Sequence, residues 1–482
     1  MGILSHLEPK GVWTWFEQLC AIPHGSGNTG RVSDWLAAFA RARGLTYWQD
    51  AMHNVIICKD ATAGYENAES VILQGHMDMV CEKAADCRKD MACEGLDLAI
   101  DGDMIYAKGT TLGGDDGIAV AIMMALLDAD DLAHPALECV FTVDEEIGMP
   151  GAAAIDVSML KGRRMLNLDS EVEGIFTVSC AGGSMVSCRL PVMRRRFAGT
   201  ALTVKITGLQ GGHSGIEIDK GRANANSLMG RVLRAAAQKT ELRLIGVEGG
   251  NKDNVIPNEC TARLIALDPA AVRGVCADME RAFRNEYAVT DSGVTVAVSD
   301  RVSDGEMYDA MDQAATQRVI CMLHCLPNGI QAMSADMEGL VQTSLNMGIL
   351  TTADTGVKAI FSVRSSVASQ KEMLWERLAC LMELLGGSTE ISGSYPGWQY
   401  RKVSPLRDLL TEVFTQQYGY GPKIEAIHAG LECGLFADKL PGLDCVSYGP
   451  ELQEIHTCRE RMSLSSVQRV WAMTVEVLRR MK

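Results

Sequence analysis

The sequence predicts an α/β protein whose mostly parallel central sheet is interrupted by an inserted α+β domain. The first ~180 residues alternate strand-like and helix-like segments, which is the pattern of a sheet with helical crossovers. Residues 184–397 instead contain alternating segments typical of antiparallel strands. With 482 residues the chain exceeds the size at which a single core usually stops growing, so two domains are expected.

Each expected element follows from its local pattern. Apolar runs predict buried strands, a long run rich in Ala and Met predicts a helix, and the amphipathic tail predicts another. In chain order we expect strands at 70–75, 137–143 and 163–169 around a helix at 117–129, antiparallel strands at 201–208, 294–300 and 358–366, a helix at 405–418, a strand at 443–449 and a helix at 465–481. A hinge with Gly and Pro at 392–398 closes the insert, so the expected domains are 1–183 with 398–482, and 184–397.

The composition and the start of the chain exclude several classes of protein. A net charge of −16 disfavours nucleic acid and anionic membranes as partners. The first residues lack the basic and apolar regions of an export signal, and the longest apolar run, at 118–127, is too short to cross a bilayer. We therefore expect a cytoplasmic protein with neither a membrane nor a nucleic acid as partner.

Sixteen cysteines are scattered along the chain without a CxxC pair. This spacing predicts reduced thiols and disfavours a disulfide scaffold, a thiol redox protein or a structural zinc protein. The closest pair, Cys321 and Cys325, lies in an apolar stretch at one-turn helical spacing. The expected interpretation of this pair is two small buried hydrophobic residues, in preference to a metal site.

Polar residues that can bind metal follow the ends of the expected strands and one glycine-rich turn. They are His76, Asp78, Asp115, Glu145, Glu146 and Asp169. Residues two apart on an extended segment point to the same side, so His76 can bind a metal while Asp78 accepts its other ring N–H. Each segment alone is compatible with a turn, a structural histidine or a solvated helix start. Because ligands collect at the carboxyl ends of strands in open α/β sheets, together these segments favour one site.

Seven ordered motifs resemble those of the aminoacyl-histidine dipeptidases of the M20 peptidase family. They are GHMDMV, TLGGDDG, VDEEIGMPGA, NLDSE, GLQGGHSG, HAGLECGLF, and SYGP with the IHT that follows it. The resemblance covers nearly the whole chain. It implies a zinc-peptidase-like catalytic domain interrupted by a lid domain, which agrees with the boundaries above. It also implies two divalent metal ions, zinc or else manganese or cobalt, and a set of His and carboxylate ligands without cysteine suits such a hydrolytic site.

The resemblance assigns roles to individual residues. The implied metal ligands are His76 and Asp169 for one ion, Glu146 and His456 for the other, and Asp115 as the bridge. Asp78 and Glu145 are then the catalytic pair that does not bind metal. After His456 this chain has Cys458 and Arg459 where many relatives have Pro and Asn. We expect this departure to alter the rigidity of the loop or the substrate preference.

Within the inserted domain, His213, Asn254 and Arg364 match positions that contact the substrate in the family. Their alternative interpretations are a surface histidine in a glycine turn, ordinary turn chemistry, and a salt bridge on a strand. His428 and Glu432 of the HAGLECG motif either line the site or pack at the start of a helix.

Hydrolysis of short peptides is the function that these residues predict. Glu145 is expected to take the proton of the attacking water, and Arg364 to bind the terminal carboxylate of the substrate. Xaa-His dipeptides such as carnosine are the expected substrates, with broader dipeptide activity. The alternatives are a tripeptidase, metallo-carboxypeptidase or amino-acid deacylase of the same family, and a non-catalytic binding module on the same fold. A short peptide is the expected partner, and a homodimer is left open.

Overall fold

The structure, a computed structural model, describes residues 2–301 and 307–482. The chain divides into two compact units. The first unit comprises Met1–Ser179, Tyr400–Ala426 and Leu431–Lys482, and the second comprises Cys180–Gln399 and Ile427–Gly430. The sequence analysis placed the changes after residues 183 and 397, whereas the units change after residues 179 and 399. It did not anticipate that the short segment Ile427–Gly430 returns to the second unit.

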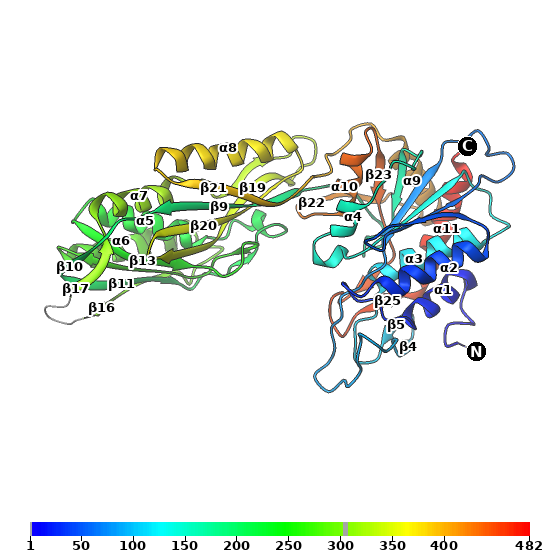
Figure 1. Ribbon diagram of the computed structural model, residues 1–482, viewed down its shortest axis with the longest axis horizontal. Helices are drawn as coiled ribbons and strands as arrows, with labels where there is room; N and C mark the ends of the chain where they lie inside the picture. The colour runs from blue at the N-terminus through cyan, green and yellow to red at the C-terminus, as the bar shows by residue number, and fades with distance from the viewer. Residues whose placement is uncertain (1, 302–306) are drawn as a thin grey trace. The chain divides into compact units, whose positions relative to one another are not determined.

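An eight-stranded sheet forms the centre of the first unit (Figure 1). In spatial order its strands are β1 (Thr46–Gln49), β2 (Val55–Lys59), β6 (Leu137–Thr142), β3 (Val71–His76), β7 (Arg164–Asn167), β23 (Asp444–Ser447), β8 (Ile175–Cys180) and β22 (Lys423–Ile427). The four central strands β6, β3, β7 and β23 run parallel. β1, β2 and β8 pair antiparallel with their neighbours. The predicted α/β sheet is confirmed, but the parallel arrangement is limited to its centre.

The register of the parallel strands brings their carboxyl ends to one edge of the sheet. His76 of β3 pairs with Thr142 of β6, and Gln74 of β3 pairs with Asn167 of β7. The chain segments that follow these three strands therefore start side by side, as the strand-end motifs require.

Helix α3 (Gly114–Asp128) is apolar on nearly all sides, and it is accordingly buried in the centre of the first unit. It packs against α1 (Lys10–Cys20) and β3. At its carboxyl end the ammonium of Lys59 donates to the carbonyl oxygens of Leu126 and Ala129, where the helix dipole favours a cation. Asp115 and Asp116 have non-helical φ and ψ angles within this span, so the regular helix starts at Gly117 as predicted and Asp115 lies just before it.

The remaining elements of the first unit surround this core. The helices are α2 (Gly30–Ala42), α4 (Pro150–Ala154), α9 (Pro405–Tyr418), α10 (Glu432–Lys439) and α11 (Leu464–Arg480), with a short 3-10 turn η1 (Glu145–Ile147). A small antiparallel sheet contains β24 (Leu452–Gln453), β25 (Arg461–Ser463), β5 (Met104–Ala107) and β4 (Leu98–Asp101). The helices predicted at 405–418 and 465–481 are confirmed as α9 and α11. Each begins at a serine whose side chain accepts a backbone N–H of the first turn.

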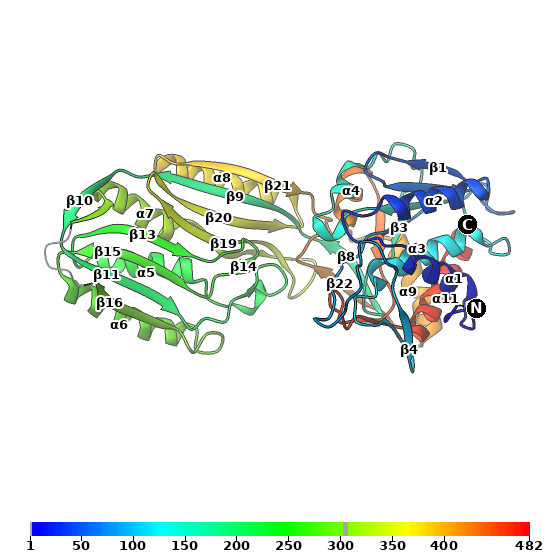
Figure 2. The same cartoon turned by 60° about the horizontal axis from the view of Figure 1, so that its bottom comes forward.

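The second unit contains a larger, antiparallel sheet (Figure 2). Its strands in spatial order are β16 (Thr295–Arg301), β11 (Thr200–Thr207), β15 (Cys260–Ala266), β13 (Leu242–Gly249), β19 (Val341–Ala353), β20 (Gly356–Ser365), β9 (Gly182–Pro191) and β21 (Ser388–Tyr395), with β18 (Gly329–Met333) beside β19. Two short pairs flank it: β10 (Arg194–Ala198) with β17 (Met307–Met311), and β12 (Gly212–His213) with β14 (Val255–Ile256). The antiparallel strands predicted at 201–208, 294–300 and 358–366 are confirmed as β11, β16 and β20.

Four helices share one apolar core with this sheet. They are α5 (Ala225–Ala237), α6 (Pro269–Glu286), α7 (Gln313–Cys325) and α8 (Ala368–Leu384), and a 3-10 turn, η2 (Ile218–Lys220), lies before α5. Along β9, Val186, Cys188 and Leu190 point into this core while Met185 and Arg189 are exposed. This alternation is the period of two expected for a sheet with one covered face. None of the helices in the described ranges is long and apolar enough to span a membrane.

Candidate metal centre

His76 is the last residue of β3, and its imidazole is almost fully buried. Its Nδ1 atom lies 2.9 Å from the backbone carbonyl oxygen of Asp78 and 3.5 Å from the Asp78 Oδ1 atom. The expected hydrogen bond to the Asp78 carboxylate is thus corrected, because the backbone carbonyl is the closer acceptor. A proton on Nδ1 leaves the lone pair of Nε2 facing the other acids, which is the tautomer that a metal-binding histidine needs.

Asp115 lies between two imidazoles. Its Oδ1 atom is 3.2 Å from His76 Nε2, and its Oδ2 atom is 3.1 Å from His456 Nε2. His76 Nε2 is also 3.6 Å from Asp169 Oδ1, and His456 Nε2 is 2.9 Å from Glu146 Oε1. The five residues that the sequence analysis selected as ligands therefore lie together, and the two oxygens of Asp115 face different halves of the cluster.

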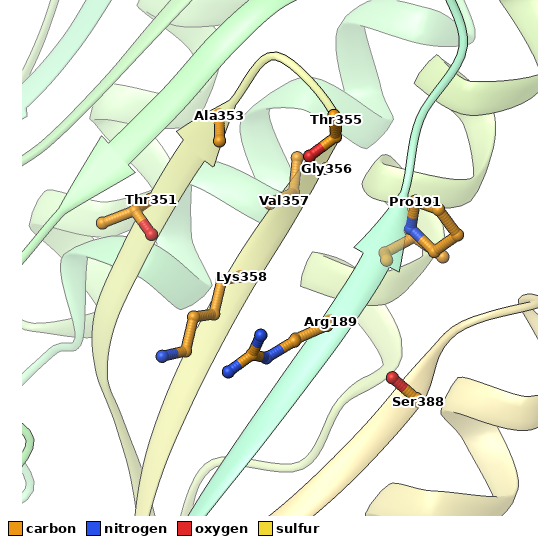
Figure 3. A pocket seen from close by; sticks show the side chains of 10 residues that line it. Arg189, Pro191, Thr351, Ala353, Thr355, Gly356, Val357, Lys358 and Ser388 are labelled. Atoms are coloured by element: carbon orange, nitrogen blue, oxygen red, sulfur yellow. The ribbon is translucent and has the colours of Figure 1, made fainter.

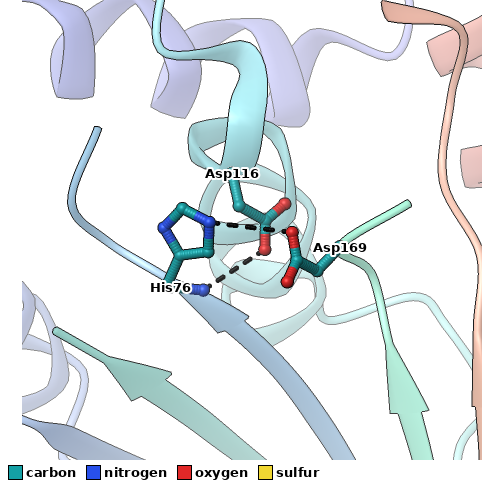
Figure 4. Close-up of side chains that lie close together, drawn as sticks. All are labelled: His76, Asp116 and Asp169. Atoms are coloured by element: carbon teal, nitrogen blue, oxygen red, sulfur yellow. Dashed lines mark hydrogen bonds and ion pairs between the residues drawn. The ribbon is translucent and has the colours of Figure 1, made fainter. Parts of the chain in front are cut away.

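Asp116 also joins this cluster, although the sequence analysis selected only Asp115 from the pair. Its Oδ2 atom accepts the backbone N–H of His76 at 3.2 Å, beside Asp169 (Figure 4). Burial, followed by the charge of Asp169, raises the pKa of Asp116 well above its usual value. The signal in the sequence was the second Asp of GGDDG, but the sequence does not show which of two adjacent carboxylates faces the strand.

The carboxylate of Asp78 fixes the turn that carries the two glutamates. Its Oδ1 atom accepts the backbone N–H of Glu145 at 3.1 Å, and its Oδ2 atom accepts that of Glu146 at 3.4 Å. The hydroxyl of Ser26 donates to the same Oδ2 atom at 2.8 Å. Asp78 therefore connects the segment after β3 to the turn after β6. Ser26 had no signal in the sequence, because its contact is between residues far apart in the chain.

The loop around His456 is held by a buried carboxylate. His456 has a φ of 59°, in the left-handed region that few non-glycine residues adopt. Glu460 is 2% exposed and accepts the backbone N–H groups of Leu112, Gly113 and Gly114 at 2.8, 3.1 and 2.8 Å. Glu460 thus ties the His456 loop to the glycine turn that places Asp115. Glu460 was not among the site residues predicted from the sequence.

Cys458 and Arg459 are not equivalent in this loop. Arg459 pairs with Glu454 at 2.9 Å, and both side chains are more than half exposed. Such a pair contributes little to stability. Cys458 is partly buried. The hydrogen bonds of Glu460 to the glycine turn involve neither Cys458 nor Arg459, so they hold this loop whichever residues occupy those two positions.

Glu432 belongs to a buried polar network between α10 and the central strands. It accepts the amide N–H of Gln74 at 2.5 Å and the hydroxyl of Thr142 at 2.6 Å, while Asn167 donates to the Gln74 Oε1 atom at 2.6 Å. Burial raises the pKa of Glu432 to about 7. This network joins the last residues of β6 and β7 to Gln74, two residues before the end of β3, next to the segments that carry the centre.

The second unit contains the three residues selected for substrate contact. Arg364 is 9% exposed, and its Nη1 atom donates to the hydroxyl of Tyr395 at 3.4 Å. Within residues 2–301 and 307–482, no carboxylate pairs with Arg364, and its Nε atom has no hydrogen-bond partner. The alternative interpretation of Arg364 as half of a strand salt bridge has no support in these contacts. A buried guanidinium with spare donors is a site for an anion.

Burial and the positive charge of Arg364 lower the pKa values of two nearby histidines. Burial, followed by the charge of Arg364, lowers the pKa of His213 and lowers that of His428 to about 3. His428 Nε2 lies 2.7 Å from the Ser344 hydroxyl, so His428 is a neutral partner in a buried hydrogen bond. The carbonyl oxygen of Asn254 accepts the N–H of Ser214 at 2.8 Å, next to His213. His213, Asn254 and Arg364 thus belong to one region of the second unit.

The donor set of the first unit fits divalent cations. In the described part of the chain, three overlapping groups bring possible ligand atoms within 4.8 Å of one another: His76, Asp116 and Asp169; His76, Glu145 and Glu146; and Asp115, Glu146 and His456. Burial raises the pKa of Asp169 to about 6. The hydrogen bond to His76 opposes this rise, and the charges of neighbouring acids add to it. Burial and neighbouring acids raise the pKa of Glu145 to about 9.

The positive charges of the two imidazoles compensate only part of the negative charge of the carboxylates in this cluster. Hydrogen bonds to Asp115 and Glu146 raise the pKa of His456 to about 10, and hydrogen bonds from both histidines lower the pKa of Asp115 despite its burial. Buried carboxylates that hold each other's pKa high attract cations strongly. Carboxylate and imidazole ligands without thiols suit zinc, manganese or cobalt.

A groove of about 420 Å³ on the second unit is lined by none of the predicted site residues (Figure 3). Lys358 of β20 and Arg189 of β9 are direct cross-strand neighbours in it. Arg189 already pairs with exposed Glu390 at 3.2 Å. The groove is lined by no histidine and no acid, so it lacks the ligands of a divalent-cation centre.

Comparisons with known proteins agree with one another. Residues 72–480 match peptidase family M20/M25/M40. The chain is 36% identical to the cytosol non-specific dipeptidase of Escherichia coli (strain K12), over 99% of both chains. It matches the crystal structure of an aminoacylhistidine dipeptidase from Vibrio alginolyticus with a TM-score of 0.94 and 35% identity, over 99% of this chain and 98% of that one. The aminopeptidase PepT from Bacillus cereus shares the fold, with a TM-score of 0.55 and 14% identity over 98% and 99% of the two chains.

Proposed function

The chain belongs to peptidase family M20/M25/M40, and from this membership we propose that it is a dipeptidase with a two-cation centre in its first unit. The observation that carries the proposal is the position of Asp115, whose two carboxylate oxygens lie 3.2 and 3.1 Å from His76 Nε2 and His456 Nε2. A carboxylate shared between two histidines is the arrangement that two neighbouring cations need. The relatives from Escherichia coli and Vibrio alginolyticus, which are 36% and 35% identical to this chain, are both named dipeptidases.

The ligands divide into two sets around Asp115. His76 and Asp169 are assigned to one cation, and Glu146 and His456 to the other, in keeping with the distances within each half. If these residues held two zinc ions, or manganese or cobalt in their place, the ions would polarise the scissile carbonyl and lower the pKa of a nearby water.

Glu145 is assigned the roles of general base and general acid. It takes the proton of the attacking water and returns it to the nitrogen of the leaving amine. Burial and neighbouring acids raise its pKa to about 9 in the metal-free chain, so it acts as a base near neutral pH only when bound cations lower that pKa. Asp78 positions Glu145 by accepting its backbone N–H at 3.1 Å.

Substrate size is set in the second unit of the chain. The buried guanidinium of Arg364, with the Tyr395 hydroxyl beside it, binds the free carboxylate of the substrate. His213 and Asn254 of the same unit are assigned to further contacts with the substrate. A recognised terminal carboxylate restricts the enzyme to short peptides. The proposed substrates are dipeptides, with Xaa-His dipeptides such as carnosine within a broader range.

Metal removal tests this function. Chelation should abolish hydrolysis of dipeptides, and about two zinc, manganese or cobalt ions per chain should restore it. A panel of Xaa-His dipeptides, other dipeptides, tripeptides and N-acyl amino acids identifies the substrate class. Full activity in metal-free protein contradicts the cation centre. Preference for tripeptides or acyl amino acids assigns the chain to another branch of the family.

A further inference from the structure

Two thiols on α7 face each other across one turn of the helix. The Sγ atoms of Cys321 and Cys325 are 3.8 Å apart. The sequence analysis expected both residues to be buried hydrophobes, but Cys321 is only partly buried and Cys325 is exposed. The buried face of α7 is formed by other residues, including Val319, Met322 and Leu323. The packing of the second unit therefore does not account for this pair.

The geometry of an α-helix allows these two thiols to bind one ion but disfavours a disulfide between them. Residues four apart on a helix have Cβ atoms about 5–6 Å apart. A disulfide requires about 3.5–4.5 Å between Cβ atoms, so an intrahelical disulfide would distort the helix. Two thiolates on one tetrahedral zinc-type ion, each about 2.3 Å from it, have their sulfurs about 3.8 Å apart. The observed separation of 3.8 Å matches the bridging ion without any movement of the backbone.

The thiols open into a groove of about 470 Å³ that contains a third donor. Its lining includes His324, which lies three residues after Cys321 and is therefore its neighbour on the helix surface. The imidazole of His324 is exposed and lies more than 4.8 Å from at least one of the two sulfurs, so binding would require it to turn towards them. We propose that this face of α7 binds a thiophilic, tetrahedral cation of the zinc class through Cys321, Cys325 and His324.

This site differs chemically from the carboxylate-rich centre of the first unit. Thiolate ligands select softer cations than carboxylates do, and the donors of the first centre include no thiol. Burial and the hydrogen bond to Cys325 raise the pKa of the Cys321 thiol. The cation therefore displaces protons on binding: two thiols and one divalent cation give one dithiolate complex and two protons.

Cadmium is the probe for this site, added to the full chain after its catalytic centre has been loaded with zinc. We expect one additional cation per chain, with the near-ultraviolet charge-transfer absorption of thiolate ligation and the release of two protons. Cys321→Ser and Cys325→Ser should each abolish the absorption, and His324→Ala should weaken binding at least about tenfold. Cys380→Ser is the matched control, because Cys380 is an exposed cysteine on α8 with no such partner in the described contacts.

Phenylarsine oxide gives a second measurement that does not depend on cation charge. It joins two thiols with loss of one water, so it should block alkylation of Cys321 and Cys325 together in the wild-type chain. Thermal unfolding and dipeptide hydrolysis show whether the serine variants remain folded. Wild-type protein without the absorption, or Cys325→Ser protein with undiminished absorption, overturns the proposal. Loss of the absorption only in the two α7 serine variants supports it.

Discussion

The carboxylate of Asp78 accepts the backbone N–H of Glu145 at 3.1 Å. This contact joins the segment after β3 to the turn after β6, so one side chain sets the position of the proposed base relative to His76. Replacing Asp78 by Asn keeps the size but puts an amide N–H against a backbone N–H. We expect Asp78→Asn to lower kcat/KM by roughly 10–100-fold with partial loss of metal affinity. Steady-state kinetics with metal analysis checks this, and unchanged kcat/KM means that the turn is fixed without Asp78.

Asp115 and Asp116 are adjacent but face different groups. Asp116 accepts the backbone N–H of His76, which an Asn side chain can also do. We expect Asp116→Asn to retain both cations and to lose less than about tenfold in activity, below the usual loss for a supporting residue. Asp115→Asn should lose at least one cation, because Asp115 lies between both histidines. Metal content of the two purified variants decides, and loss of a cation in Asp116→Asn alone reverses the assignment.

Arg364 should distinguish free from blocked substrates. Amidation of the terminal carboxylate leaves the buried guanidinium without its anion, at a cost of about 2 kcal/mol or more, or roughly 30-fold in kcat/KM. In Arg364→Gln the same amidation should cost much less, since the partner is already gone. Tyr395→Phe, which removes the hydroxyl beside Arg364, serves as a milder change in the same contact. Equal turnover of free and amidated dipeptides by the wild-type enzyme removes Arg364 from this role.

His428 predicts a pH dependence of stability. Its pKa is about 3 in the folded chain because of burial and Arg364, whereas an unfolded histidine titrates near 6.5. Below pH 6.5 His428 is protonated in the unfolded chain but stays neutral in the folded chain. The free energy of unfolding therefore falls as the pH falls. Between pH 7 and 5 this histidine should account for about 2 kcal/mol.

Urea denaturation of wild type and His428→Gln at both pH values measures this contribution. The variant should show a smaller difference between pH 7 and 5. Ser344→Ala is the matched control, because it removes the hydrogen bond to His428 at 2.7 Å without removing the titrating group. It should lower stability at both pH values. The same pH dependence in wild type and His428→Gln means that the folded imidazole accepts a proton.

The sequence predicted those features that depend on local pattern. Apolar runs gave β3, β6 and β7, and polar residues at their ends gave the candidate ligands, because parallel strands bring their carboxyl ends together. Residues whose contacts span hundreds of positions were missed. Glu460 binds backbone groups near residue 113, and only the folded chain brings these segments together. The exposure of Cys325 was also missed, since helical spacing does not show which face is buried.

Glu145 and Glu146 are adjacent at the turn after β6, yet they face different neighbours. Glu146 Oε1 lies 2.9 Å from His456 Nε2, whereas Glu145 is assigned to the attacking water. Glu145→Gln keeps size and hydrogen bonding but removes the basic carboxylate. Activity should therefore fall by roughly 10²–10⁴-fold while both cations stay bound. Rate and metal content are measured together on the purified variant.

Glu146→Gln exchanges an anionic ligand for a neutral one, so occupancy of the second cation should fall. Excess metal should restore part of the activity of this variant and none of the activity of Glu145→Gln, because added cations replace a weak ligand but not a missing base. If Glu145→Gln loses a cation while Glu146→Gln keeps two and is inactive, the two roles are exchanged. If both variants remain active, neither carboxylate takes part in the reaction and the proposed mechanism is wrong.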